Sequence, residues 1–287
     1  MVVIILILTG VCGNVLVIIA TTSKQSIRSS VNSFIISLAV ADLCSSLGMS
    51  FIVISLINGK WSYNGRVCNF NGFSNVTFSL ASALTVSAIS VNLFLATRGS
   101  VSNGNTLLMK KRRHLFLFTI WIFAIVLAFL PILGWSRYEY FPTRGICFWK
   151  YSTSKSYTTT FYVIAAPACL TATVAYWKIY NFLRARKRRV IPSLNRETLV
   201  ATLETERKIT ISIFLVLFTY YTTLTPFTLL NIIESSNPLL HIPPWIDLGT
   251  YLLAMSNHVN NVFIYSIMMR KYRKTFSSLF CLSRCIK

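Results

Sequence analysis

Acidic residues are scarce in this chain of 287 residues, which has seven aspartates and glutamates against 28 lysines and arginines. Charged residues of both signs make up only 12% of the chain, about half the share found in an ordinary water-soluble domain. So few charges cannot cover a surface exposed to water, and hydrophobic residues reach 54%. The composition therefore disfavours a soluble protein and indicates lipid as the solvent.

The basic excess gives a formal net charge of +21 but does not indicate nucleic-acid binding. The charges lie in segments between long apolar stretches and not on the face of a soluble domain. The sequence also lacks a CxxC pair, a Cys/His metal-ligand spacing and an apparent Ser/His/Asp set. We therefore expect neither an enzyme nor a nucleic-acid partner.

Long apolar stretches fill nearly the whole sequence, and about 20 such residues cross a bilayer as one helix. We predict an all-α membrane protein, a single seven-transmembrane helix bundle over residues 1–287. The spans are expected near residues 2–21, 32–57, 68–97, 114–134, 158–182, 206–234 and 245–268. A short amphipathic surface helix is expected at about 270–281, with Cys281 and Cys285 as palmitoylation sites. An unmodified basic tail is the alternative.

Basic residues are distributed unevenly among the connecting segments. The segments after the first, third and fifth spans and the tail hold 22 of the 28 lysines and arginines. The alternate segments hold the rest: Lys60, Arg66, Arg137, Arg144, Lys150 and Lys155. The positive-inside rule then predicts a cytoplasmic C-terminus and an extracellular N-terminus.

Asp42 is the acidic residue that the spans place deep in the membrane, where a carboxylate costs about 2.5–3.5 kcal/mol. Polar partners are expected, and the candidates are Asn14, Ser82, Asn257, His258 and Asn261. Two interpretations stay open. One is a pocket for water or a sodium ion at Asp42, and the other is a hydrogen-bond cluster without an ion. No other metal is expected.

Two cysteines lie on the predicted outer side of the membrane, where disulfides persist. Cys68 begins the third span and Cys147 lies in the loop after the fourth. We expect a disulfide that holds this loop over the mouth of the bundle, with two free thiols as the alternative. Three prolines, Pro131, Pro167 and Pro226, are expected to interrupt spans, and Pro226 is either a hinge or a static kink.

An ordered set of motifs extends across essentially the whole chain. It comprises Asn14 in GNVLVI, Asp42 in LAVAD, Trp61, Cys68 with Cys147, Trp121, Pro167, Pro226, and Asn261 through Tyr265. The set resembles that of the rhodopsin-like (class A) G-protein-coupled receptors. The resemblance implies a plasma-membrane receptor with a pocket for a small extracellular ligand. It also implies an outward swing of the sixth helix that admits a heterotrimeric G protein.

Within that family the sequence looks opsin-like, in the stretches from Pro131 to Tyr138 and from Tyr265 to Lys274. The retinal-binding lysine is absent, because its position is Met255 and residues 245–268 contain no lysine. Without an amine no Schiff base can form, so no covalent cofactor is expected. The aspartate that amine receptors use is Asn75 here, which cannot pair with an ammonium ion.

Several residues depart from the positions that the resemblance assigns to the activation switch. The Asp-Arg-Tyr triplet is Asn92-Leu93-Phe94, so Leu93 replaces the arginine that meets the G protein, and coupling is in doubt. Glu206 thereby loses its partner on the third helix. Leu224 replaces the tryptophan before Pro226, and Val262 replaces the last motif's proline. Tyr176 falls one residue late, whereas Tyr265 is retained.

A ligand pocket is predicted near the outer ends of the third, sixth and seventh spans. Its candidate residues are Asn71, Asn75, Ser79, Phe227, Asn231, Tyr251 and Met255, with Phe148 and Trp149 of the outer loop as a cap. A signalling receptor without an assigned ligand is the favoured function. A non-signalling receptor, either a decoy or a heteromer partner, is the alternative. A transporter is a remote one, since no internal repeat is visible.

Overall fold

The computed structural model describes residues 1–23, 31–99, 110–150, 154–190, 196–237, 240, 242–268 and 272–273. Its helices are α1 (Val2–Thr22), α2 (Asn32–Gly48), α3 (Ser50–Asn58), α4 (Gly65–Gly99), α5 (Lys110–Phe129), α6 (Lys155–Val190), α7 (Arg196–Ser236) and α8 (Pro244–Met268). Two strands, β1 (Tyr138–Phe141) and β2 (Ile146–Trp149), lie between α5 and α6. Because α2 and α3 together form one span, the predicted seven-helix bundle is confirmed.

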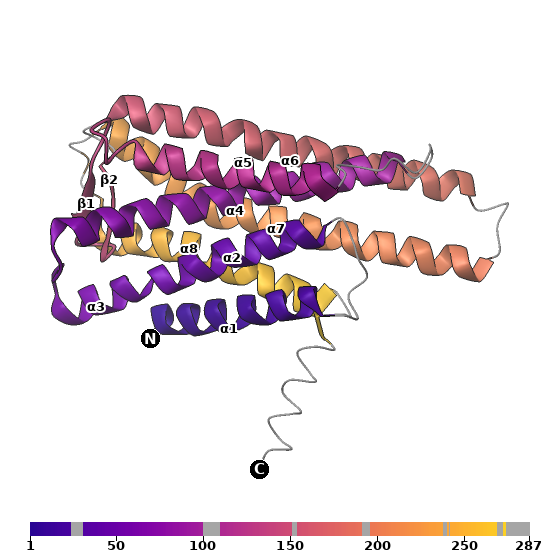
Figure 1. Ribbon diagram of the computed structural model, residues 1–287, viewed down its shortest axis with the longest axis horizontal. Helices are drawn as coiled ribbons and strands as arrows, with labels where there is room; N and C mark the ends of the chain where they lie inside the picture. Colours follow the sequence, from indigo (N-terminus) through magenta and orange to yellow (C-terminus); the bar gives the residue numbers. More distant parts are fainter. Residues whose placement is uncertain are drawn as a thin grey trace, which may run out of the picture.

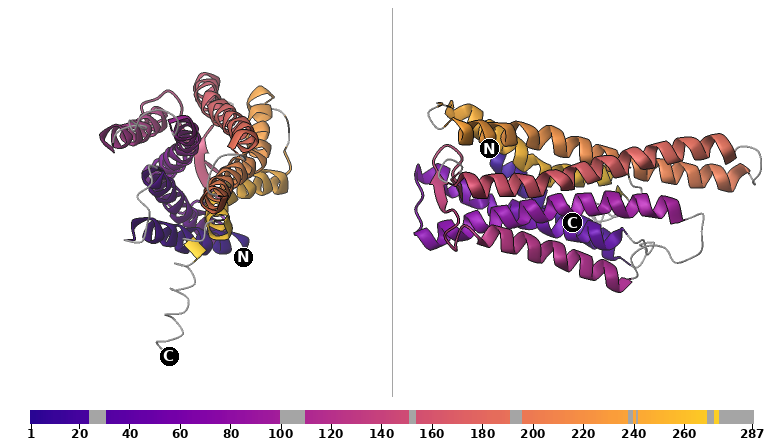
Figure 2. Two further views of the ribbon diagram at one scale, coloured as in Figure 1. Left: turned by 90° about the vertical axis from the view of Figure 1, so that its right-hand side faces the viewer. Right: turned by 90° about the horizontal axis from the view of Figure 1, so that it is seen from above.

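The helices run side by side along one axis, and the β1–β2 hairpin lies at one end of the bundle (Figures 1 and 2). We call this the hairpin end. Helix α4 contacts α2, α5, α6 and both strands, and α7 packs against α8. At the opposite end, α6 and α7 project beyond the other helices (Figures 1 and 2). With 36 and 41 residues, they are both longer than the predicted spans.

Two helix ends differ from the predicted spans. The second span breaks at Met49, where Ser46 donates its hydroxyl to the carbonyl of Asp42 and Ser50 to that of Leu47. Such bonds from serine compete with the helix backbone and bend it. The fourth span ends at Phe129, so Pro131 lies in the turn after α5 and does not interrupt a helix. Pro167 and Pro226 do lie inside helices, as expected.

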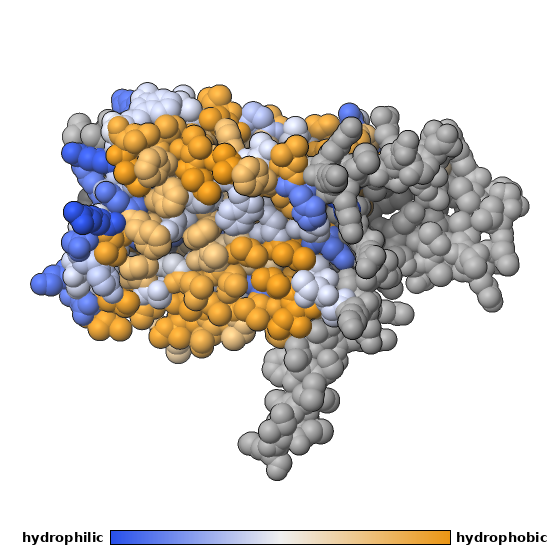
Figure 3. All heavy atoms as spheres, viewed as in Figure 1, coloured by the Kyte–Doolittle hydropathy of each residue, from blue (hydrophilic) through white to orange (hydrophobic). Residues whose placement is uncertain are grey.

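The outward side chains of the bundle are apolar. Leu8, Phe118, Val163, Leu170 and Phe218 are each more than half exposed, and apolar residues form a broad band along the helices (Figure 3). Among the described residues, five helical stretches are long and apolar enough to cross a membrane, and Arg113–Phe129 is a shorter apolar helix. Helix α8 is not among them, because it carries several asparagines and a histidine. The chain is therefore a multi-pass membrane protein.

The buried side chains form two apolar clusters, one toward the hairpin end and one toward the opposite end. The first includes Tyr138, Trp149 and Tyr251, and the second includes Phe34 and Tyr265. On α2, Leu38 and Ala39 belong to the second cluster and Ala41 belongs to the first. Asp42 comes directly after them on the same helix. A polar layer around Asp42 thus lies between two apolar layers.

The predicted surface helix near residues 270–281, with Cys281 and Cys285, lies outside the described residues apart from Tyr272 and Arg273. Tyr272 is 2% exposed and stacks on Tyr265, with ring centroids 5.6 Å apart. Its hydroxyl shares a hydrogen bond of 3.0 Å with Thr21 of α1. The start of the tail is therefore anchored against α1 and α8.

Candidate functional site at the hairpin end

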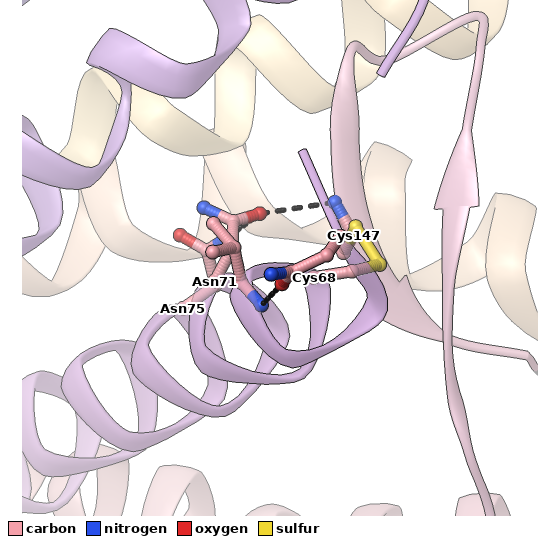
Figure 4. Close-up of a disulfide and its surroundings, with 6 residues drawn as sticks. Cys68, Asn71, Asn75 and Cys147 are labelled. Atoms are coloured by element: carbon pink, nitrogen blue, oxygen red, sulfur yellow. Dashed lines mark hydrogen bonds between the residues drawn. A yellow bond between two sulfur atoms is a disulfide. The ribbon is translucent and has the colours of Figure 1, made fainter. Parts of the chain in front are cut away.

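A disulfide joins Cys68, at the start of α4, to Cys147 in β2, as predicted (Figure 4). Asn71, one helical turn further along α4, accepts a 3.0 Å hydrogen bond from the backbone N–H of Cys147. Asn75 donates to the same Asn71 oxygen at 3.3 Å. These two predicted pocket residues therefore fix β2 to α4.

The other strand of the hairpin is held by Tyr138, whose hydroxyl donates to the carbonyl of Ala128 at 2.7 Å. Burial raises the pKa of the Tyr138 phenol far above its usual range, and the nearby Tyr157 adds to the rise. The phenol therefore stays protonated and can donate. A Cβ atom on Gly72 would lie 2.2 Å from the Tyr138 ring, so only glycine allows this close approach to α4.

The turn between the strands directs Arg144 into the bundle. Residues 142–145 connect the strands, because Phe141 pairs with Ile146. Gly145 has a φ of 69°, a left-handed conformation that glycine adopts without strain, and its N–H and that of Arg144 both donate to the carbonyl of Phe141. Arg144 is only 1% exposed.

Three polar side chains from α7 and α8 surround the Arg144 guanidinium. Its Nε lies 2.6 Å from the Asp247 carboxylate, and its Nη2 lies 2.5 Å from the same oxygen. Nη2 also donates to the Asn231 side chain at 3.2 Å and lies 3.4 Å from the Glu234 carboxylate. Thr143 donates its hydroxyl to the second Asp247 oxygen. Here the Arg144 site denotes Arg144 with Asn231, Glu234 and Asp247.

Aromatic rings continue from this site into the bundle. Phe227 packs edge to face against Phe148 and Tyr251, with centroids 6.3 and 5.6 Å away. Phe148 stacks on Trp149 at 4.1 Å. Met255 and Tyr251 are buried in the same apolar cluster, whereas Ser79 is half-buried. The structure thus brings most of the predicted pocket residues from α7, α8 and β2 together.

Asp42 forms a second polar site, between the two apolar clusters. One carboxylate oxygen accepts from the Ser82 hydroxyl at 2.9 Å and lies 2.8 Å from Nδ1 of His258. The other oxygen accepts from Asn261 at 2.9 Å. Asn14 instead donates to the carbonyls of Gly10 and His258. The cluster therefore ties α1, α2, α4 and α8 together.

Two buried acceptors of α8 lack partners among the described residues. They are the side-chain oxygens of Asn257 and Asn261. Both side chains are 2% exposed. Buried acceptors of this kind are commonly satisfied by ordered water.

Most of the residues assigned to the activation switch lie toward the opposite end, whereas Pro226 precedes Phe227 of the first apolar cluster. Leu93 packs against the second apolar cluster, and Lys178 of α6 lies 5.5 Å above the ring of Phe94. Asn92 is buried, and its amide has no partner among the described residues. Tyr176 contacts Phe214, while Leu224 touches both apolar clusters. Glu206 lies in α7, but its side chain is outside the described part of the structure.

Sequence reasoning missed the Arg144 site, because it counted Arg144 only as a basic residue of an outer loop. A signal was nevertheless present. Arg144 precedes Cys147 by three residues, so the disulfide brings it to the mouth of the bundle. Glu234 and Asp247 are two of only seven acidic residues in the chain, and both flank that mouth. A buried arginine requires such partners.

The chain matches the family model described as 7 transmembrane receptor (rhodopsin family) over residues 13–265. It therefore belongs to the rhodopsin family of seven-transmembrane receptors, as the motif order predicts.

Melanopsin-A of Gadus morhua is 26% identical over 93% of this chain and 50% of its own length. A GQ-coupled rhodopsin of Mizuhopecten yessoensis is 26% identical over 96% of this chain and 58% of its own length. This chain thus spans about half the length of these relatives. A crystal structure of squid rhodopsin shares the fold, with a TM-score of 0.84 and 22% identity over 98% of this chain and 84% of that one.

Proposed function

We propose that this chain is a receptor that carries an extracellular small-ligand signal across the plasma membrane to a heterotrimeric G protein. Membership of the rhodopsin family supports a signalling receptor. The hairpin end then faces outward and α6 and α7 project into the cytoplasm, in agreement with the positive-inside rule. The relatives are receptors, so catalysis is not part of the proposal.

One observation carries this proposal: the polar site at the hairpin end is joined directly to the proline of α7. Phe227, which touches both Arg144 and Tyr251, follows Pro226 in sequence. Proline removes a backbone hydrogen bond, so α7 can bend there at low cost. A ligand that alters contacts at Phe227 can thus shift the half of α7 that reaches the opposite end.

We propose no covalent retinal in this receptor. The Schiff base needs an amine, and α8 has no lysine; Met255 fills the position implied by the resemblance and is 7% exposed within the apolar cluster. A methionine thioether cannot form an imine. The likeness to opsins therefore supports the fold and the signalling role, and not light detection by that chemistry.

We also propose that hydrogen bonds, and not a sodium ion, satisfy Asp42. A hard cation such as sodium takes oxygen ligands. At Asp42, donors from Ser82 and Asn261 and an imidazole nitrogen of His258 already face the carboxylate. His258 places a nitrogen at the carboxylate oxygen that also accepts from Ser82, and we assign the unpartnered side-chain oxygens of Asn257 and Asn261 to water, so no step of the mechanism depends on sodium.

Leu93 supports a second candidate, a non-signalling receptor that acts as a decoy or a heteromer partner. Its apolar side chain packs against the bundle and offers no charge to a G protein. The two candidates differ in whether the wild-type chain activates a G protein at all.

Expression of wild type and Leu93→Arg in cells, with an energy-transfer panel for each G-protein class, separates the two candidates. Leu95→Arg is the matched control, because Leu95 lies two residues further along α4 and is 40% exposed. If the chain is a signalling receptor, wild type should activate one G-protein class without ligand. This basal activation should increase further in Leu93→Arg and not in Leu95→Arg. Activation by Leu93→Arg alone favours the non-signalling receptor. Silence of both, with surface levels verified, shows that the receptor does not activate a G protein without ligand, and ligand binding is then tested before signalling.

A further inference from the structure

The Arg144 site at the hairpin end is built around a guanidinium. The cation binds through two nitrogens to Asp247, at 2.6 and 2.5 Å, and through one of these to Asn231, at 3.2 Å. Both nitrogens converge on one Asp247 oxygen, a contact that two neighbouring nitrogens of a planar guanidinium can make together. The partners come from α7 and α8, and not from the hairpin that carries Arg144.

Aromatic rings pack against the same cation. The Arg144 Cζ lies 4.9 Å from the ring centre of Phe141 and 5.1 Å from that of Phe227. Both distances are within the range in which a ring attracts a cation through its quadrupole. Phe227 belongs to α7, so this contact is also available to a cation that does not come from the hairpin.

The described side chains of the site carry an excess of negative charge. Two carboxylates, Asp247 and Glu234, face one guanidinium. Asp247 is 10% exposed as a side chain, whereas Glu234 is 30% exposed and meets Arg144 only at 3.4 Å. Glu234 therefore presents an acceptor at the surface from which a second cation can approach. An anion approaching by this route meets repulsion.

We propose that this is the ligand subsite of the receptor and that it takes an organic cation, either a guanidinium or a compact ammonium. The ligand cation replaces the Arg144 guanidinium on Asp247, Asn231 and Glu234, and Arg144 is the occupant of the unliganded receptor. This proposal rests on the receptor function proposed above. It adds to that function a class of ligand, an organic cation. Asn75 cannot bind such a cation through a charge, because it is a neutral amide and is hydrogen-bonded to Asn71.

The position of Arg144 in the chain makes the exchange feasible. It lies in the turn of residues 142–145, three residues before the disulfide-bonded Cys147. The tip can therefore withdraw while Cys147 stays fixed to α4. The same movement releases Thr143 from Asp247 and Arg144 from Phe227, so ligand entry reaches the residue that follows Pro226.

The test uses the purified full chain as wild type, Arg144→Ala, and Arg144→Ala combined with Asp247→Asn. Thermal unfolding is followed with methylguanidinium, with methylurea as its uncharged counterpart, and with acetate. We expect Arg144→Ala to unfold at a lower temperature than wild type. Saturating methylguanidinium raises that temperature by about 3 °C, and methylurea does not. The added Asp247→Asn change abolishes the rise.

Arg137→Ala is the matched control, because Arg137 belongs to the same loop but its side chain is 63% exposed. It should show no rescue by methylguanidinium. Equal effects of methylguanidinium and methylurea on Arg144→Ala overturn the proposal. Stabilisation of wild type by acetate overturns it as well, since the natural ligand is then an anion that binds Arg144 itself.

Wild type supplies a second measurement that does not depend on the folding of Arg144→Ala. Agmatine, which carries a guanidinium and an ammonium, should increase hydrogen exchange in residues 142–145 and leave β2 protected. Unchanged exchange at millimolar agmatine overturns the proposal. Neither measurement involves a G protein. If the receptor binds these cations but activates no G protein, the cation site is supported and the proposed coupling is contradicted.

Discussion

Nδ1 of His258 lies 2.8 Å from a carboxylate oxygen of Asp42, although 216 positions separate the two residues. Both side chains are almost fully buried, at 4% and 0% exposure. This contact connects α2 to α8 at the level between the two apolar clusters. Any relative movement of these helices must therefore break or rebuild it, which makes the pair a sensitive point for substitution.

Removal of the imidazole should destabilise the bundle. His258→Ala leaves a buried carboxylate oxygen with Ser82 as its remaining donor among those described, a loss of about 1–3 kcal/mol. Thermal unfolding of the purified chain measures the change. Asn260→Ala, on the same helix but without a contact to Asp42, is the control. If sodium in place of choline raised the unfolding temperature of wild type, the hydrogen-bonded account of Asp42 would be wrong.

Close packing of α1 against α8 depends on a glycine. A Cβ atom on Gly13 would lie 2.6 Å from a methyl group of Val262. Gly13→Ala should therefore cost about 1–3 kcal/mol through overpacking. The additional change Val262→Ala should recover part of that loss, which a double-mutant cycle detects. Gly249→Ala meets nothing within 4 Å and should be neutral or slightly stabilising. Additive effects of the Gly13 and Val262 changes would refute the contact.

The disulfide should contribute to stability as well as to the position of the hairpin. Replacing both Cys68 and Cys147 with serine opens a loop of 79 residues and should cost about 2–4 kcal/mol. Reductant should lower the unfolding temperature of wild type and leave the double variant unchanged. Cys12→Ser, which alters an exposed free thiol of α1, serves as the control. Insensitivity of wild type to reductant would contradict this expectation.

Tyr138 should make stability fall at alkaline pH. Burial raises the pKa of its phenol in the folded state above the unfolded value of about 10. Its contribution is thus fully present below pH of about 10 and is lost as the unfolded chain deprotonates above that value. The free energy of unfolding of Tyr138→Phe should be about 1 kcal/mol lower than that of wild type at neutral pH. It should also fall less steeply with pH above neutrality. Unfolding of wild type and Tyr138→Phe, followed from neutral to alkaline pH, measures this difference in stability. Tyr63→Phe is the control, because Tyr63 is more exposed. Parallel curves of stability against pH for wild type and Tyr138→Phe would exclude the effect.

The seven spans could be predicted from the sequence because their signal is local. A helix in lipid must satisfy its own backbone hydrogen bonds and show apolar side chains to its surroundings, so its length and composition reveal it. The same local signal fails at helix ends. The break at Met49 and the end of α5 before Pro131 depend on serine hydroxyls and turn bonds that hydropathy does not register. The long extensions of α6 and α7 are polar and escape it too.

The disulfide and the polar partners of Asp42 were within reach of sequence reasoning for a different reason. Membrane topology assigns each residue a side and a depth, and few polar groups share the depth of Asp42. Ser82, His258 and Asn261 were therefore natural candidates, although their distances to the carboxylate come only from the structure.

The sequence by itself determined the seven-helix bundle and the side of the membrane on which Cys68 and Cys147 lie, because lipid imposes length, composition and sidedness on each segment, and the order of its motifs indicated the receptor family. Tertiary structure alone decided what fills the mouth of the bundle. Arg144 looks like any basic loop residue until the β1–β2 turn and the disulfide carry it beside Asp247, which is 103 positions away. A buried ion pair between distant segments leaves no periodic pattern in the sequence, since its energy depends only on where the fold brings the two charges.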